Sequence, residues 1–168
     1  VEFPTVGSPY RTDSYFNPDK TYIGYWDHQG CYRYKGETHF PFGEDQYFYR
    51  NSTVDPTTKE CNKGSDKDEY SGNLLNFAAT SSIDVLRLAM TGGHREVDTT
   101  DTTILARAFL YNGWQTNSGS SNFPARKIKR EHLGKYLPAA PANITVTDDI
   151  FVSNCKNVIM FGTRSGNH

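Results

Sequence analysis

The stretch that decides the fold is SGNLLNFAATSSIDVLRLAMTGGHR, residues 71–95. Its apolar residues recur every three or four positions, which is the spacing of one face of an α-helix. The sequence therefore predicts a helix that begins at Ser71-Gly72-Asn73 and ends at Gly92-Gly93, where glycine can supply the left-handed residue that ends helices. Ser81-Ser82 is a point at which this helix can bend or divide in two. We expect burial, against a sheet, of an apolar stripe made of Leu75, Ala79, Ile83, Leu86 and Met90.

The segment before this helix is rich in aromatic residues. Alternating positions in TYIGYW, followed by the turn-like DHQG, favour a short hairpin over residues 21–35. Residues 51–70 are mostly polar and are expected to form a loop.

Two further features are predicted after the helix. Asp101 or Thr102 can cap a second, shorter helix. Residues 143–154 and 157–163 read as two strands that pair around a tight turn. The inner face of the second helix would consist of Ile104, Leu105, Ala108 and Phe109.

A cluster of basic residues lies between these two features. Such a cluster can bind phosphate groups. The net charge of the chain is only −1, however, and no nucleic-acid-binding motif is present. We therefore expect no nucleic-acid partner and read as a solvated face Arg126, Lys127, Lys129, Arg130 and Lys135.

The size and composition of the chain are those of one domain with a modest core. It has 168 residues, of which 36% are hydrophobic and 14% aromatic, and its mean hydropathy is −0.69. Aromatic rings must therefore supply much of the buried area. No apolar run approaches the roughly 18–20 residues that span a bilayer, so no membrane span is expected.

The chain offers no lead to an enzyme. It lacks G-x-S-x-G, a glycine-rich phosphate loop and paired histidines at metal-binding spacing, so neither a catalytic residue nor a cofactor is predicted. The carboxylates Asp66, Asp68 and Glu69 lack the spacing of a calcium loop. No metal site is predicted, and these three residues are expected in a solvated loop.

The cysteines Cys31, Cys61 and Cys155 form no C-x-x-C pair, which argues against zinc and thioredoxin-type chemistry. Composition alone favours three buried thiols. The alternative, in an oxidising compartment, is a disulfide between Cys31 and Cys61, which would contribute about 3–4 kcal/mol by closing a long loop.

The quoted stretch, followed by TDTTILARAFL, closely resembles the PilC/PilY family of type IV pilus tip-associated proteins. The family pattern at this point is S-G-N-F-L-N-W-x-T-M-x-R-I-D-x-L-R-x-x-L-x-G-G. Upstream, NPDKTYIGYWDHQGCYRY resembles the family's P-x-x-x-Y-Y-G-Y-F-D-x-x-x-C-Y-x-Y. The matching segments cover residues 15–34 and 71–110 and occur in the family's order.

The resemblance implies a von Willebrand A-like region. The metal site of such regions has the pattern D-x-S-x-S, whereas TNSGS (116–120) has Thr116 in place of the aspartate and is read as a loop. The expected fold is α+β, an incomplete von Willebrand A-like α/β region with one long helix, one short helix, a few short strands and a large aromatic-rich loop insertion. Residues 1–70 would be the insertion, closed by a disulfide between Cys31 and Cys61. Residues 71–168 would supply the helices and the strand pair of the same structural unit.

The function that the resemblance implies is adhesion or assembly at a bacterial cell surface, without catalysis. The expected partners are pilus or filament subunits, or the remainder of a longer polypeptide. The alternative is a secreted carbohydrate-binding module, because exposed aromatic rings stack on sugars, and a secreted enzyme fragment is a third hypothesis. The candidate binding residues are Tyr22, Tyr25 and Trp26.

Overall fold

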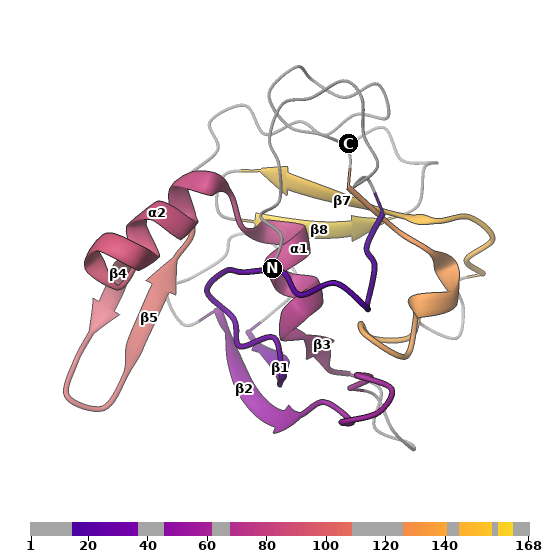
Figure 1. Ribbon diagram of the computed structural model, residues 1–168, viewed down its shortest axis with the longest axis horizontal. Coiled ribbons are helices and arrows are strands. Elements are labelled where there is room, and N and C mark those ends of the chain that lie inside the picture. Colours follow the sequence, from indigo (N-terminus) through magenta and orange to yellow (C-terminus); the bar gives the residue numbers. More distant parts are fainter. Residues whose placement is uncertain are drawn as a thin grey trace.

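The structure is a computed structural model in which two helices and three small antiparallel sheets are present (Figure 1). The residues it describes are 15–36, 46–61, 68–108, 126–140, 145–155 and 158–162. The elements are β1 (Gly30–Lys35), β2 (Tyr47–Thr53), β3 (Tyr70–Ser71), α1 (Gly72–Ala79), α2 (Ser82–Thr91), β4 (His94–Asp98), β5 (Thr103–Ala106), β6 (Arg126–Ile128), a 3-10 turn (Arg130–His132), β7 (Ile150–Cys155) and β8 (Val158–Gly162).

Helix α1 carries the core, and every one of its residues is buried. Its apolar side chains pack on β6 and β7 and on aromatic rings from the N-terminal segment, so residues on both sides of position 70 share one hydrophobic cluster. The division of the chain at residue 70 stays a prediction. The buried members of the cluster are Phe16, Tyr22, Leu74, Phe77, Ala78, Ile128, Tyr136, Leu137, Ile150 and Val152.

Two asparagine side chains fasten the segment 20–26 to α1. Asn73 accepts from the backbone N–H of Tyr22 (2.8 Å) and donates to the carbonyl of Lys20 (2.7 Å). Asn76 accepts from the N–H of Trp26 (3.1 Å) and donates to the carbonyls of Tyr22 (3.0 Å) and Trp26 (2.7 Å). The two segments that resemble family motifs therefore contact each other through side-chain amides.

The expected long helix is two helices. Thr80 is extended (φ −80°, ψ 133°), and Ser81 starts α2 with a capping box in which Asp84 is the reciprocal partner. Gly92, at φ 76°, ends α2 as predicted. Because the extended residues redirect the chain, the apolar stripe does not continue along one face.

The predicted burial of the second half of the stripe is wrong. Leu75 and Ala79 of α1 are buried, but on α2 the side chains of Ile83, Leu86 and Met90 are 44%, 52% and 76% exposed. The side of α2 that faces the protein instead carries Asp84, which is 1% exposed.

A strand replaces the predicted second helix. Residues 103–106 form β5, which pairs antiparallel with β4 across a turn in which Thr99 and Thr102 hydrogen-bond each other. The β-branched residues Thr103 and Ile104 suit this pairing. The resulting hairpin extends with α2 to one side of the molecule, on the left of Figure 1.

The strand predictions before and after the helices had different outcomes. The expected hairpin over residues 21–35 is wrong, because β1 pairs instead with β2 and β3, and β2 occupies part of the predicted loop 51–70. The C-terminal pair is confirmed, although β7 begins at Ile150, later than predicted: β7 and β8 are antiparallel, with Phe151 opposite Gly162.

The fold is thus mixed α/β. Every sheet in the described part of the chain is antiparallel, and the von Willebrand A-like assignment stays a prediction. Among the same residues, no helix is long and apolar enough to cross a membrane.

Candidate functional site

Tyr22, the first candidate binding residue, lies in the core. Its side chain is 3% exposed, and its ring lies 5.1 Å from that of Phe77. The hydroxyl accepts a hydrogen bond from the N–H of Asn17. The proposed ligand-binding role of Tyr22 is therefore corrected: a buried ring cannot stack on a sugar.

Tyr25 and Trp26 are half-buried. The Trp26 ring makes edge contacts with Tyr25 (6.5 Å between centroids) and with Phe48 of β2 (6.2 Å). Burial raises the pKa of the Tyr25 hydroxyl above its usual value. These rings are engaged with one another, and their role in binding stays a prediction.

Cys31 and Cys61 form the disulfide that the family resemblance implied, with 2.04 Å between the sulfur atoms. It joins the start of β1 to the segment that follows β2. Both half-cystines are buried. The disulfide therefore closes the base of the loop that runs from Cys31 to Cys61.

The carboxylates considered for a metal site have protein partners. Asp68 pairs with Arg33 (3.0 Å between Oδ1 and Nη2). Glu69 is buried and accepts hydrogen bonds from Asn51 (2.6 Å) and Ser52 (3.0 Å). Asp66 and Thr116 lie outside the described residues. Within the described ranges, no three His, Cys, Asp or Glu residues are grouped as metal ligands.

The basic segment is only partly a solvated face. Lys129, Arg130 and Lys135 are exposed, whereas Arg126 is 7% exposed and enters the core beside α1. Burial and the nearby Arg107 lower the pKa of the Arg126 guanidinium to about 10. The prediction of a solvated face is therefore wrong for Arg126, because its guanidinium meets the carbonyl groups at the end of α1.

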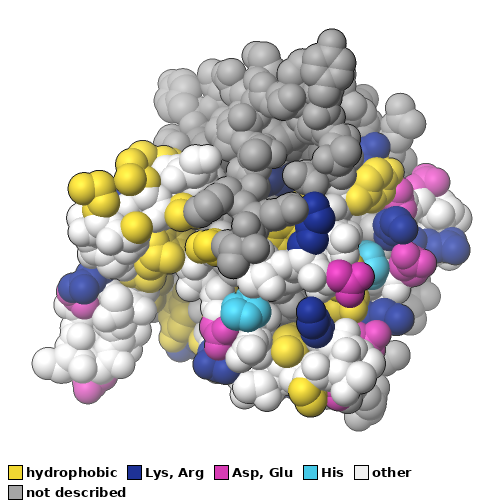
Figure 2. All heavy atoms as spheres, viewed as in Figure 1, with side chains coloured by type: hydrophobic (Ala, Val, Ile, Leu, Met, Phe, Trp, Pro, Cys, Tyr) yellow, Lys and Arg dark blue, Asp and Glu magenta, His cyan; other side chains and the backbone are white. Residues whose placement is uncertain are grey.

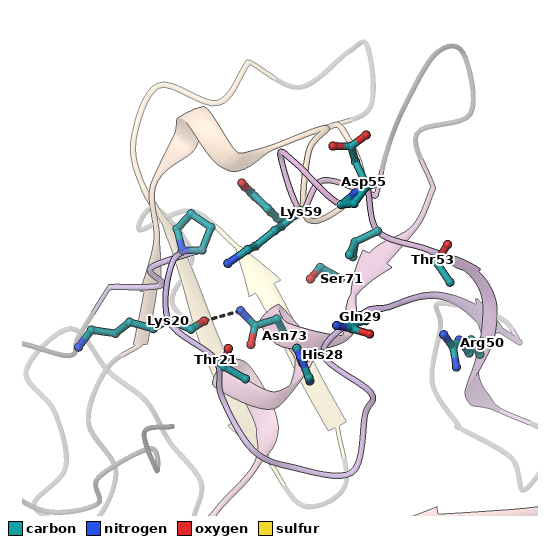
Figure 3. A pocket seen from close by; sticks show the side chains of 14 residues that line it. Lys20, Thr21, His28, Gln29, Arg50, Thr53, Asp55, Lys59, Ser71 and Asn73 are labelled. Carbon is teal, nitrogen blue, oxygen red and sulfur yellow. Dashed lines mark hydrogen bonds between the residues drawn. The ribbon is translucent and has the colours of Figure 1, made fainter.

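A pocket of about 380 Å³, which the sequence did not indicate, lies beside the start of α1 (Figure 3). Five separate parts of the chain enclose it: residues 18–21, 28–29, 50–59 and 71–73, and Tyr136. Its lining is partly polar and partly apolar and carries several cationic side chains. The lining residues are Pro18, Lys20, Thr21, His28, Gln29, Arg50, Thr53, Val54, Asp55, Pro56, Lys59, Ser71, Asn73 and Tyr136.

The turn on one side of the pocket is tightly fixed. Asp55 accepts hydrogen bonds from the backbone N–H groups of Thr57 (2.8 Å) and Thr58 (2.7 Å). The hydroxyl of Tyr136 donates to the carbonyl of Thr58 (3.1 Å). The turn ends at Lys59, which has φ 58° and is the one non-glycine residue with positive φ in the described part.

The opposite side of the pocket is the N-terminus of α1. Ser71 is the N-cap residue, yet its side chain makes no capping hydrogen bond. The residue is only 1% exposed and lines the pocket. The first N–H groups of any helix lack intrahelical acceptors, so this end carries partial positive charge.

The exposed face of α2 is the second surface feature. Ile83, Leu86 and Met90, here called the α2 stripe, are spaced at i, i+3 and i+7 and so lie on one side of the helix. Hydrophobic side chains gather over this region of the surface in Figure 2.

These features define a small, disulfide-bonded α/β domain with a cationic pocket and an apolar helix face. Residues 13–161 match the family described as PilY1 homolog, small alpha/beta domain, and the chain belongs to that family.

Two related proteins from Xylella fastidiosa (strain Temecula1 / ATCC 700964) carry the name type IV pilus biogenesis factor PilY1 homolog. One is 37% identical over 141 residues, covering 83% of this chain and 11% of the relative. The other is 35% identical over 96 residues, covering 56% of this chain and 6% of the relative. The chain thus matches a small part of each relative's length. No solved structure matches it.

Proposed function

We propose that this chain is a non-catalytic assembly domain of a type IV pilus biogenesis factor that acts at the bacterial cell surface. The family membership and the names of the two relatives support the pilus assignment. The Cys31–Cys61 disulfide supports a location outside the cytoplasm, where disulfides persist. An adhesive role, and a von Willebrand A-like region in the same polypeptide, are the finer parts of this proposal.

The observation that carries an assembly role is the α2 stripe. Contiguous apolar side chains on a protein surface commonly mark a contact with another protein surface. The opposite side of α2 is held in place, because buried Asp84 bonds both Ser81 and the backbone N–H of Ala108. The stripe is therefore presented outward by a helix of fixed position.

We propose that another domain of the same polypeptide covers the α2 stripe. Three side chains bury much less than the roughly 1,000 Å² that a specific complex between separate proteins needs. A contact within one chain can be smaller, because the covalent connection supplies a high effective concentration. The matched region is 11% of one relative, so such a protein has ample chain to supply the partner surface.

The experiment places Leu86→Lys in the complete polypeptide that contains this chain. We expect faster proteolysis within residues 82–106 and fewer surface pili, because a lysine cannot be buried in an apolar contact without a large desolvation cost. Thr100→Lys is the matched control: it adds the same charge to the exposed tip of the same β4–β5 hairpin, away from the stripe.

The isolated chain separates docking from folding. Leu86 is exposed there, so Leu86→Lys should leave its thermal midpoint unchanged. Wild-type pili and wild-type proteolysis in the complete variant would exclude the docking role. A concentration-dependent dimer of the isolated chain that Leu86→Lys abolishes would identify a second copy as the occupant instead.

The carbohydrate-binding alternative has weaker support. Of its three candidate residues, Tyr22 is buried, and the Trp26 ring already packs against Tyr25 and Phe48. Binding of the isolated chain to a glycan array, lost in Trp26→Ala, would favour it over the assembly role.

A further inference from the structure

The pocket beside α1 is distinct from the α2 stripe and carries an inference of its own. In Figure 3 the side chain of Lys59 extends into the pocket, toward Asn73. The ammonium group of Lys59 has no carboxylate partner among the described residues. One positive charge therefore faces the interior of the pocket without an ion-pair partner from the part of the chain that the structure describes.

The acidic residue in the lining does not neutralise Lys59. The Asp55 carboxylate accepts hydrogen bonds from Thr57 and Thr58 within its own turn, and it points away from Lys59 in Figure 3. At the rim, Arg50 pairs with Asp27 (3.1 Å), which lies outside the lining. The charges inside the pocket thus favour an anion.

Ser71 supplies a second and independent sign of a ligand. Its side chain is buried and lines the pocket, and it makes no capping hydrogen bond to the first turn of α1. Buried hydroxyls normally have a partner. The same end of α1 is the positive end of the helix. An anion in the pocket would lie between the start of α1, with Ser71, and the side chain of Lys59.

The backbone conformation of Lys59 also supports a ligand-binding role for the pocket. At φ 58° a glycine is free of the steric cost that any residue with a Cβ carries. A lysine at this position retains that strain, and such strain is characteristic of functional sites. The turn is also fixed at its end, because the Cys61 N–H donates to the carbonyl of Lys135 and Cys61 is bonded to Cys31. The backbone that carries the Lys59 side chain is thus held in place.

We propose that this pocket binds the carboxylate of an acidic side chain from a protein partner. Pro18, Val54 and Pro56 supply apolar lining for the methylene groups of such a side chain. The lining offers no exposed Phe, Tyr or Trp ring on which a sugar can stack, because Tyr136 is 7% exposed and its hydroxyl donates to Thr58. The other ring of the lining is the small imidazole of His28. Of the other cations of the lining, Lys20 points away from the pocket in Figure 3 and Arg50 pairs with Asp27. The Lys59 ammonium therefore matches a singly charged carboxylate better than a phosphate, which prefers several cations.

The test is titration of the isotope-labelled chain, followed by NMR, with N-acetyl-glutamate amide and with its neutral counterpart N-acetyl-glutamine amide. The glutamate probe should shift the amide signals of residues 54–60 and 71–74 with a Kd on the order of 1 mM, as expected of a small single-site ligand. The glutamine probe should not shift them. Parallel titrations with glucuronate and with inorganic phosphate test a sugar acid and a phosphate as ligands of the pocket.

The decisive variant is Lys59→Gly. It removes the ammonium group but relieves the left-handed backbone, so we expect at least a tenfold loss of glutamate affinity together with an unchanged or raised thermal midpoint. Ser71→Ala should weaken binding to a smaller extent. Lys135→Gln is the matched control, since it removes one positive charge close to the turn but outside the lining.

Each remaining outcome overturns the proposal. Equal shifts with glutamate and glutamine, or undiminished binding in Lys59→Gly, would show that Lys59 recognises no carboxylate. Tighter binding of glucuronate or phosphate than of glutamate would assign the pocket to a different ligand. Because Leu86→Lys leaves this pocket intact, failure here is distinguishable from failure of the α2 docking role.

Discussion

Arg126 of β6 donates a hydrogen bond to the carbonyl oxygen of Phe77 in α1, and its guanidinium lies 5.7 Å from the centre of the Phe77 ring. It also donates to the carbonyl of Thr80 (3.2 Å), while Arg107 donates to that of Ala79 (3.4 Å). The last carbonyls of a helix have no intrahelical partner and carry partial negative charge. Two buried cations thus satisfy the end of α1 within the protein.

Arg126→Met should destabilise the chain by about 2–4 kcal/mol in urea unfolding, because it leaves two buried carbonyls without donors. This loss of stability is partly offset, because removal of the guanidinium also removes the cost of burying its charge. The same burial lowers the pKa of the group. Arg130→Met, at an exposed position of the same segment, should stay within about 0.5 kcal/mol of wild type. Equal effects of the two substitutions would contradict the capping role.

Leu74→Ala and Leu86→Ala should differ sharply although both leucines belong to the quoted stretch. Leu74 is 0% exposed, so its truncation should cost about 2–5 kcal/mol, whereas Leu86 is 52% exposed and should cost less than about 1 kcal/mol. Chemical denaturation of the isolated chain measures both. A large effect at Leu86 would mean that α2 faces inward.

Replacing Cys31 and Cys61 together by alanine should lower the free energy of unfolding by about 3–4 kcal/mol, the loop-closure entropy for the 30-residue separation. Reduction of the wild-type chain should have a similar effect, and reduction of the variant should have none. A variant as stable as the oxidised wild type would show that the 50–61 segment is held by its hydrogen bonds alone.

Acid should destabilise the chain through His132. Burial lowers the pKa of this side chain below 6.5, against the raising effect of Glu131 and with the lowering effect of Lys129 and Lys135. The neutral ring packs on Phe16 and Tyr136. Because the unfolded chain binds the proton more readily, stability should fall as the pH drops from 6.5 toward the lower pKa of the folded state.

His132→Phe removes the group that takes up this proton. Its unfolding free energy should fall less steeply than that of wild type just below pH 6.5 in parallel denaturant titrations. Identical slopes for the two proteins would exclude His132 as the source of the acid sensitivity.

The parts of the fold that sequence could predict are those with local signals. Gly92 marked the end of α2, and the apolar runs in β7 and β8 marked the C-terminal strand pair. Ser81-Ser82 was correctly seen as a possible break. The burial of the α2 stripe depended on the direction that the chain takes at Thr80. The helical spacing of apolar residues carries no information about that direction.

The parts that could not be predicted depend on distant residues. The TILA segment suits a helix or a strand, and pairing with β4 decides between them. Arg126 looked like its exposed basic neighbours, although its position opposite the end of α1 buries it. The pocket combines five separate parts of the chain and had no sequence signal. The one local clue to the pocket was Lys59, a lysine at the end of a tight turn.

The side-chain amides of Asn73 and Asn76 tie the folding of the segment 20–26 to the folding of α1. Their bonds with the backbone of Tyr22 span 51 and 54 residues, so neither segment can complete its contacts before the chain between them has been brought together. Such distant pairings slow folding. They also mean that the amide protons of Tyr22 and Trp26 should exchange with solvent only when α1 itself opens.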